Sequence, residues 1–339
     1  MHSFNEQKIK SDFFEDRRLY NLSQDWEVIG LNTQNKKESL ELKYPKCIYI
    51  GLLNQCNISC PHCAWFSQVH KETQTNDYFN DLKRLPKNKV SEILDYAKEA
   101  NCKIIFSGPG EPLLESNLID FVQEAKHKGI KNIEIATNGV LLNEKIFNDL
   151  LVSGVTCLTT KICFTKFAEE IYSQFGNNFI EDFKKTLKKY CIFLSKNSSG
   201  VKIELIISYD REYFKEAFYF FTDIQEWANE SCKIELAYYP SNIKWWESSK
   251  LNNLRHTCSA PFSNLYIFPD GSVGVCMRCQ LLLGREEVEN LRIGNIYSQN
   301  LNEIWQGEIH KKWTSWHIDS YFDELKPCLN CACWWNELE

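Results

Sequence analysis

Three closely spaced cysteines follow an apolar segment, in the sequence Cys56-Asn-Ile-Ser-Cys60-Pro-His-Cys63. The preceding residues 47–53 are apolar and partly β-branched, which predicts a buried strand that delivers the cysteines to the end of a sheet. Three thiolates on one short loop can ligate three irons of a [4Fe–4S] cluster and leave the fourth iron open. The spacing differs from the CxxC pairs of zinc ribbons and from the four-cysteine run of bacterial ferredoxins.

The chain has 15 cysteines among 339 residues and a formal net charge of −6. So many thiols in a long, charged chain favour metal or cluster ligation over a disulfide framework. Cys47, Cys157 and Cys191 lie in apolar stretches, and we expect them to be buried like small hydrophobic side chains. The net negative charge argues against nonspecific nucleic-acid binding, which needs a basic surface. With no secretion signal and no apolar run long enough for a membrane span, we expect a cytoplasmic protein.

From residue 47 onward, strand-like and helix-like patterns alternate, which predicts an α/β fold with a parallel sheet. The predicted strands are 47–53, 103–107, 132–136, 156–162, 202–208 and 233–239. The predicted helices are 87–100, 118–128, 144–152, 180–195 and 213–228. Right-handed crossovers place successive strands side by side, so we expect the loops after the strands to face one cavity.

Two of those loops carry polar signals. After the second predicted strand comes Ser107-Gly108-Pro109-Gly110-Glu111-Pro112, in which glycines allow close backbone approach and Glu111 can accept from an ammonium group. After the third strand comes Thr137-Asn138-Gly139, which also suits an ordinary helix-entry turn. The sequence therefore predicts a ligand site at the carboxyl ends of these strands.

The CxxxCxxC pattern after a first strand resembles the cluster motif of the radical S-adenosylmethionine (radical SAM) superfamily. The resemblance implies a partial (β/α)6 barrel in which Cys56, Cys60 and Cys63 hold a [4Fe–4S] cluster. In that family SAM chelates the fourth iron, and one electron cleaves it to a 5′-deoxyadenosyl radical that removes a hydrogen atom from the substrate. The residue before the third cysteine is usually Tyr or Phe; here it is His62, whose flat ring we expect near the adenine.

The glycine-rich loop resembles the family's GGEP motif, with Pro109 in place of the commoner second glycine. The residues that the resemblance assigns to SAM binding are Gly108, Gly110, Glu111, Pro112, Thr137 and Asn138. Many relatives end the fourth strand with a serine and an acidic residue, whereas this chain has Thr159-Thr160-Lys161-Ile162-Cys163. Lys161 is suited to bind an anionic ligand group, and it is equally typical of a solvent-exposed strand end.

A second group of cysteines lies near the carboxyl end of the sequence. Residues 264–275 between Cys258 and Cys276 predict a β-hairpin with its turn at 269–272, which brings the flanking cysteines together. The pattern CX12GX4C followed by a distant CxxC resembles the twitch module, a shortened SPASM module. It implies a second, fully coordinated [4Fe–4S] cluster, whose ligands would be Cys258, Cys276, Cys328 and Cys331.

A zinc site is the competing interpretation of these carboxyl-terminal cysteines. The two CxxC pairs, Cys276/Cys279 and Cys328/Cys331, suit tetrahedral zinc but leave Cys258 unexplained. Cys333 is surplus in both interpretations. We expect a partly ordered N-terminal extension at 1–46, the barrel at 47–250 and a twitch/SPASM-like auxiliary cluster domain at 251–339.

The resemblance implies an oxidation, because a fully ligated second cluster suits electron transfer. The expected substrate is small, polar and sugar- or cyclitol-like, and a flavodoxin or ferredoxin is the expected electron donor. The main alternative is a maturase that modifies a ribosomal peptide, for which Cys163 is the candidate hydrogen-atom donor. A non-enzymatic iron–sulfur or zinc-binding protein is the third possibility. Trp245 and Trp246 lie where a substrate could stack, although paired aromatics commonly fill domain seams.

Overall fold

The computed structural model describes residues 42–60, 63, 66, 77–176, 178–196, 200–238, 258, 260–276, 292–319 and 328. Most of the expected N-terminal extension, with its weak helical pattern, lies outside the described residues. Trp245 and Trp246 lie outside them as well. No helix in the described ranges is long and apolar enough to cross a membrane.

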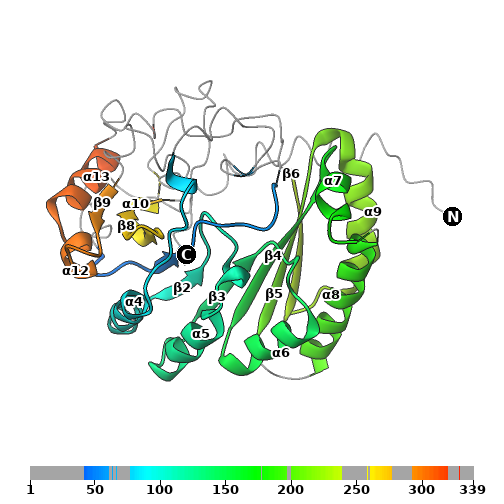
Figure 1. Cartoon of the computed structure of the whole chain (residues 1–339), viewed down its shortest axis with the longest axis horizontal. Helices are drawn as coiled ribbons and strands as arrows, with labels where there is room; N and C mark the ends of the chain where they lie inside the picture. The colour runs from blue at the N-terminus through cyan, green and yellow to red at the C-terminus, as the bar shows by residue number, and fades with distance from the viewer. Residues whose placement is uncertain are drawn as a thin grey trace.

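Six parallel strands form the barrel part of the sheet, and the predicted α/β class is confirmed. The strands are β1 (Cys47–Ile50), β2 (Lys103–Phe106), β3 (Ile133–Thr137), β4 (Cys157–Phe164), β5 (Lys202–Tyr209) and β6 (Cys232–Tyr238). The helices between them are α4 (Lys87–Glu99), α5 (Leu118–His127), α6 (Glu144–Ser153), α7 (Ala168–Ser173), α8 (Phe179–Lys196) and α9 (Phe214–Ile224). Short 3-10 turns occur at Asp77–Phe79, Pro112–Leu114, Arg211–Tyr213 and Gln225–Trp227. In Figure 1 the helices lie along the outer side of the curved sheet.

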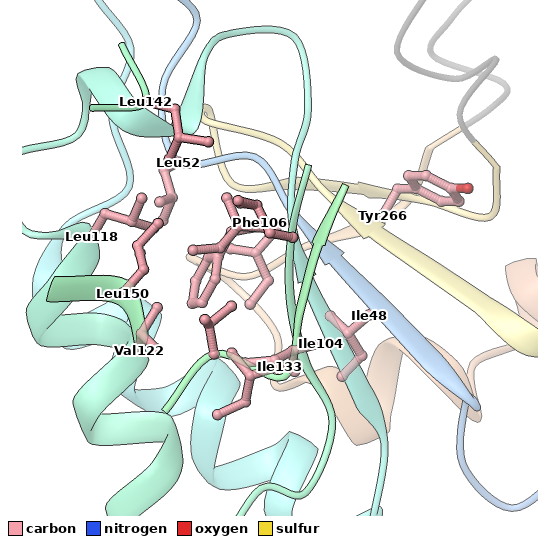
Figure 2. Packing of buried hydrophobic residues seen from close by; sticks show 14 of the residues in the cluster. Ile48, Leu52, Ile104, Phe106, Leu118, Val122, Ile133, Leu142, Leu150 and Tyr266 are labelled. Atoms are coloured by element: carbon pink, nitrogen blue, oxygen red, sulfur yellow. The ribbon is translucent and has the colours of Figure 1, made fainter. Parts of the chain in front are cut away.

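Successive side chains along a strand point to opposite sides of the sheet, so its two faces carry different residues. On β1, Ile48 and Ile50 are fully buried in the core under the helices, and Tyr49 lies on the opposite, concave face. Helix α4 meets the core through Val90, Ile93, Leu94 and Ala97, an i, i+3, i+4, i+7 stripe. Figure 2 shows part of this core around Phe106. The concave face is thus the side that is left for a ligand.

The carboxyl-terminal part continues the same sheet. It adds β7 (Asn264–Ile267), β8 (Ser272–Gly274) and β9 (Arg292–Asn295), together with α10 (Ala260–Ser263), α12 (Leu301–Trp305) and α13 (Glu308–Ile318). Strand β7 pairs in parallel with β1, and β8 and β9 follow in antiparallel pairing. The predicted hairpin is confirmed: the Gly271 amide donates to the Phe268 carbonyl at 2.9 Å within its turn.

Two expectations about structural cysteines need correction. Cys191 is buried as expected, but it forms a disulfide with Cys232 that joins α8 to β6, with a Cα–Cα distance of 5.7 Å. Cys157 is only partly buried, because its side chain lies on the concave face of β4. Cys47 is buried as a free thiol, as expected.

Candidate functional site

The loops after β1 and β2 touch through their backbones at the carboxyl end of the sheet. The Glu111 amide donates to the Gln55 carbonyl at 2.8 Å. A Cβ added to Gly110 would lie 2.5 Å from the Gln55 carbonyl oxygen and would also collide with the Leu53 carbonyl. Gly108 has φ +137°, and a Cβ there would lie 2.8 Å from the Gly51 Cα. Only glycine fits at both positions, so the glycine-rich loop packs directly against the cysteine loop.

Glu111 joins the loop after β2 to the loop after β3. Its side chain is 2% exposed, and one oxygen accepts from the Leu113 amide at 2.9 Å and from Thr137 Oγ1 at 2.6 Å. The other oxygen accepts from the Asn138 amide at 2.8 Å. Burial raises the pKa of Glu111, and these hydrogen bonds oppose the rise. A carboxylate has about four acceptor positions, so one remains for a ligand ammonium group.

Asn138 takes part in the turn before α6 and also contacts the cysteine loop. The Val140 amide donates to Asn138 Oδ1 at 3.0 Å, which forms the turn that precedes α6. Asn138 Nδ2 points the other way, toward Asn57 Oδ1 at 2.8 Å and Cys56 Sγ at 3.7 Å. The loop after β3 therefore reaches the cysteine loop.

The three loop cysteines lie close together. The Cys163 thiol, burial and the charges of Cys63 and Cys56 raise the pKa of Cys60, and burial raises the pKa of Cys56 to about 12. The Cys63 amide donates to the Cys60 carbonyl at 2.9 Å, and the Phe66 amide donates to Cys63 Sγ at 3.4 Å. Within the described residues, no three His, Cys, Asp or Glu side chains are already arranged as a metal site. His62 lies outside the described residues.

The donor set fits an iron–sulfur cluster with SAM beside it. Three thiols share one loop; Asn138 Nδ2 donates to Cys56 Sγ and the Phe66 amide donates to Cys63 Sγ, as hydrogen bonds to sulfur do around such clusters. Asn57 Nδ2 is buried without a hydrogen-bond partner among the described residues, which leaves one donor for a ligand. Together with the glycine cradle, these groups suit a ligand that meets the backbone closely.

Cys163 lies against the cysteine loop. Ser208 Oγ donates to Cys163 Sγ at 3.1 Å, and the Cys163 thiol is among the groups that raise the pKa of Cys60. The Cys163 amide donates to the Tyr172 hydroxyl at 2.9 Å. Sequence analysis missed Ser208 and Tyr172. The signal available for Ser208 was the strand register, because Cys163 on β4 pairs with Ser208 on β5.

The carboxyl-terminal cysteines border the β7–β8 hairpin. Cys258 and Cys328 are buried, and Cys276 is partly buried. Gly274, the last residue of β8, pairs with Tyr266, and Cys276 follows it two residues later. Burial raises the pKa of Tyr266, and Tyr49 and Cys276 add to the rise. Cys331 lies outside the described residues, as do Cys279 and Cys333.

Comparison with known families agrees with this geometry. The radical SAM superfamily model matches residues 50–203, and the SPASM model, an iron–sulfur cluster-binding domain, matches residues 258–332. The chain belongs to the radical SAM superfamily and carries a SPASM-type module. Its cofactors are accordingly SAM and [4Fe–4S] clusters, and the match to an iron–sulfur domain favours a cluster over zinc at the carboxyl-terminal cysteines.

Individual relatives match over parts of the chain. The chain is 33% identical over 103 residues to the uncharacterized protein MJ0103 of Methanocaldococcus jannaschii. This match covers 30% of this chain and 24% of that protein. The chain is also 26% identical over 145 residues to the probable GTP 3′,8-cyclase of Methanococcus vannielii, covering 43% and 44%. The chain thus spans less than half the length of these relatives.

A solved structure supports the fold over most of the chain. BtrN, crystallised in complex with AdoMet and 2-DOIA, superposes with a TM-score of 0.53 at 16% identity. The superposition covers 86% of this chain and 94% of BtrN. At that identity the likeness shows a common fold, which here includes both the barrel strands and the carboxyl-terminal strands.

Proposed function

We propose that this protein is a radical SAM oxidoreductase that removes two hydrogens from a small polar, sugar- or cyclitol-like substrate. The observation that carries the proposal is the pairing of β1 with β7 over four registered residue pairs. Strand β1 leads into the first cysteine loop, and β7 opens the hairpin bordered by Cys258 and Cys276. One sheet thereby connects the two groups of cysteines, with the first loop at the carboxyl end of β1 and with Cys258 and Cys276 toward the amino end of β7. This connection supports an oxidation in which a second cluster would accept an electron.

Each group in this proposal has a defined task. Cys56, Cys60 and Cys63 hold the first cluster, and the second is held by Cys258, Cys276, Cys328 and Cys331. The SAM-binding residues are Gly108, Gly110, Glu111, Pro112, Thr137 and Asn138, with His62 beside the adenine. When bound, SAM and its cluster supply hydrogen-atom abstraction. A cluster held by Cys258, Cys276, Cys328 and Cys331 would supply an acceptor for the second electron of a two-electron oxidation.

The concave face supports a polar substrate. Its side chains on β3 to β6 include Glu134, Thr159, Lys161, Glu204 and Glu235. Thr159 Oγ1 donates to Glu134 at 2.9 Å, and Lys103 pairs with the same carboxylate at 2.6 Å. Polar groups held in this way can orient hydroxyl and amino groups of a substrate. A flavodoxin- or ferredoxin-type protein is the proposed source of the reducing electron.

The test uses anaerobically reconstituted full-length protein with SAM and dithionite. A panel of aminocyclitols and amino sugars, each deuterated at its carbinol carbons, is offered as substrate. We expect deuterium in the 5′-deoxyadenosine and a product that has lost one deuterium and one proton, both measured by mass spectrometry. The C258A/C276A double variant should still form 5′-deoxyadenosine but lose the oxidised product. Deuterium transfer from a labelled peptide panel instead would contradict the proposed substrate class.

A further inference from the structure

The side chain of Asn57, the residue after Cys56, contacts Asn138 from the loop after β3. Asn57 Oδ1 accepts from Asn138 Nδ2 at 2.8 Å. Asn138 is itself fixed, because its Oδ1 accepts from the Val140 amide at 3.0 Å and its own amide donates to the buried Glu111 carboxylate at 2.8 Å. The orientation of both side-chain amides is therefore set by the loop after β3.

This arrangement directs the amide nitrogen of Asn57 away from Asn138. Since Asn57 Oδ1 faces the Asn138 donor, Nδ2 lies on the other side of the same planar group. Asn57 Nδ2 is buried and has no hydrogen-bond partner among the described residues. Buried polar groups in native proteins are nearly always hydrogen-bonded, and a donor left unpaired costs free energy. We therefore expect the group that occupies the site to supply an acceptor.

The position of the two amides indicates which acceptor this is. Both amides lie beside the Cys56 sulfur: Asn138 Nδ2 is 3.7 Å from Cys56 Sγ, and Asn57 Oδ1 is 3.9 Å from it. Each iron of a [4Fe–4S] cluster binds sulfides besides its cysteine, so ligation by Cys56 brings acceptor sulfurs to this side of the loop. SAM instead chelates the iron that has no cysteine.

We propose that Asn57 Nδ2 donates a hydrogen bond to a sulfur of the SAM-binding cluster, and that Asn138 is the positioning residue that orients it. Hydrogen bonds to the sulfurs are among the features that set the reduction potential of an iron–sulfur cluster. One-electron reduction adds negative charge to the cluster, so the donor stabilises the reduced form and raises the potential. The inference rests on the proposed ligation by Cys56 and is independent of the substrate.

The experiment is an EPR-monitored redox titration of the anaerobically reconstituted full-length protein without substrate, on the parent and on N57L, N57A and N132L. The SAM-binding cluster is identified as the signal that changes when SAM is added after the titration. N57L replaces the amide with an apolar branched side chain, and N57A removes the donor without adding bulk. N132L is the matched control, because Asn132 is exposed before the amino end of β3, whereas the cysteine loop follows the carboxyl end of β1. The auxiliary cluster signal is an internal control, since a general folding fault would shift it as well.

In N57L and N57A we expect about a tenfold lower ratio of reduced to oxidised cluster at a fixed potential, which equals a downward shift of about 59 mV for a one-electron couple. N132L and the auxiliary cluster should titrate as in the parent. An unchanged or raised potential of the SAM-binding cluster in both Asn57 variants would overturn the inference.

The affinity for SAM, measured by isothermal titration calorimetry on the same proteins, separates a cluster sulfur from a SAM atom as the acceptor. We expect the affinity of the Asn57 variants to stay close to that of the parent. A tenfold weaker affinity at an unchanged potential would overturn the inference, because the amide would then donate to SAM. A parent without any SAM-responsive signal would refute the ligation by the cysteine loop itself.

Discussion

At the scale of single residues, the candidate site is fixed by close backbone contacts and by one buried carboxylate. Gly108 and Gly110 bring the loop after β2 onto the loop that carries the cysteines. Glu111 then holds Thr137 and Asn138 from the loop after β3. Each contact is a hydrogen bond or a steric fit that leaves little room for a substitution. The ligand cradle therefore depends on a few residues that do not themselves carry redox chemistry.

Replacing Gly110 with alanine should separate these two loops. The new Cβ meets backbone atoms of Leu53 and Gln55, which cannot rotate away as a flexible side chain would. We expect at least a tenfold loss of SAM affinity in G110A, about 1.4 kcal/mol, measured by isothermal titration calorimetry on reconstituted protein. G200A is the control, because Gly200 has φ +71° but no atom within 4 Å of an added Cβ. Equal SAM affinity in G110A and the parent would contradict the assigned fit.

The sequence revealed part of this site and missed part of it. It predicted Gly108, Gly110 and Glu111 as binding residues, but it did not indicate that Glu111 already accepts three hydrogen bonds. The contact between Cys163 and Ser208 joins residues of two different strands, so it depends on strand order and register. Short motifs predict residue types in a site, whereas their partners are determined by the tertiary fold.

At the scale of elements, alternating strand and helix patterns predicted the order of the barrel part. Strand β2 begins at Lys103 as expected, and helix α4 covers nearly the whole predicted range. Short elements were missed: α7 has six residues, too few for a helical apolar pattern to show. Two long-range contacts between elements lead to testable predictions about stability.

The disulfide between Cys191 and Cys232 should stabilise the edge of the barrel. It joins α8 to the outermost strand β6 across a sequence separation of 41 residues. Removing it in C232A should lower the free energy of unfolding by about 2–4 kcal/mol, measured by urea unfolding without reductant. C157A lacks only a free thiol and should lose less. If a reductant lowers the stability of C232A as much as that of the parent, the assignment is contradicted.

His310 should make the carboxyl-terminal part sensitive to acid. Its ring nitrogens lie 2.6 Å from the Trp305 carbonyl and 2.7 Å from the Pro261 carbonyl, so α13 is joined to α12 and α10. Burial lowers the pKa of His310 from its ordinary value of 6.5, although both carbonyl contacts oppose the shift. The unfolded chain therefore takes up a proton at a higher pH than the folded chain does.

The free energy of unfolding should consequently fall as the pH drops below about 6.5. Urea unfolding followed by tryptophan fluorescence at pH 7.5 and at pH 5.5 measures the difference. In H310Q this pH dependence should shrink, while the variant loses about 1–3 kcal/mol at both pH values from unpaired carbonyls. H127Q is the control, because His127 is exposed on α5. An identical pH dependence in H310Q and the parent would show that another group is responsible.

At the scale of the whole molecule, the barrel and the auxiliary module share one nine-stranded sheet within the described residues. The sequence predicted the hairpin but not its pairing with β1, because pairing between strands more than 200 residues apart leaves no local pattern. Trp305 Nε1 adds a contact by donating to the Leu42 carbonyl at 3.0 Å, just before β1. The module is therefore part of the support for the strand that leads into the first cysteine loop.

Removing the module should unfold the barrel as well. A chain truncated after residue 257 loses β7 and exposes the edge of β1 together with its apolar neighbours. We expect this fragment to be insoluble or to aggregate, because exposed strand edges commonly pair with other chains. Its soluble yield and limited proteolysis measure this. A soluble fragment with the parent's protease resistance between residues 77 and 238 would contradict the shared-sheet account.

The central claim is that one chain holds two [4Fe–4S] clusters at its two groups of cysteines. The most direct test is the iron, sulfide and zinc content after anaerobic reconstitution, on the parent and on the C56A/C60A/C63A triple variant. We expect about eight irons in the parent, about four in the variant and no stoichiometric zinc. About four irons with one zinc in the parent would contradict the claim, because the carboxyl-terminal cysteines would then form a structural site without redox function.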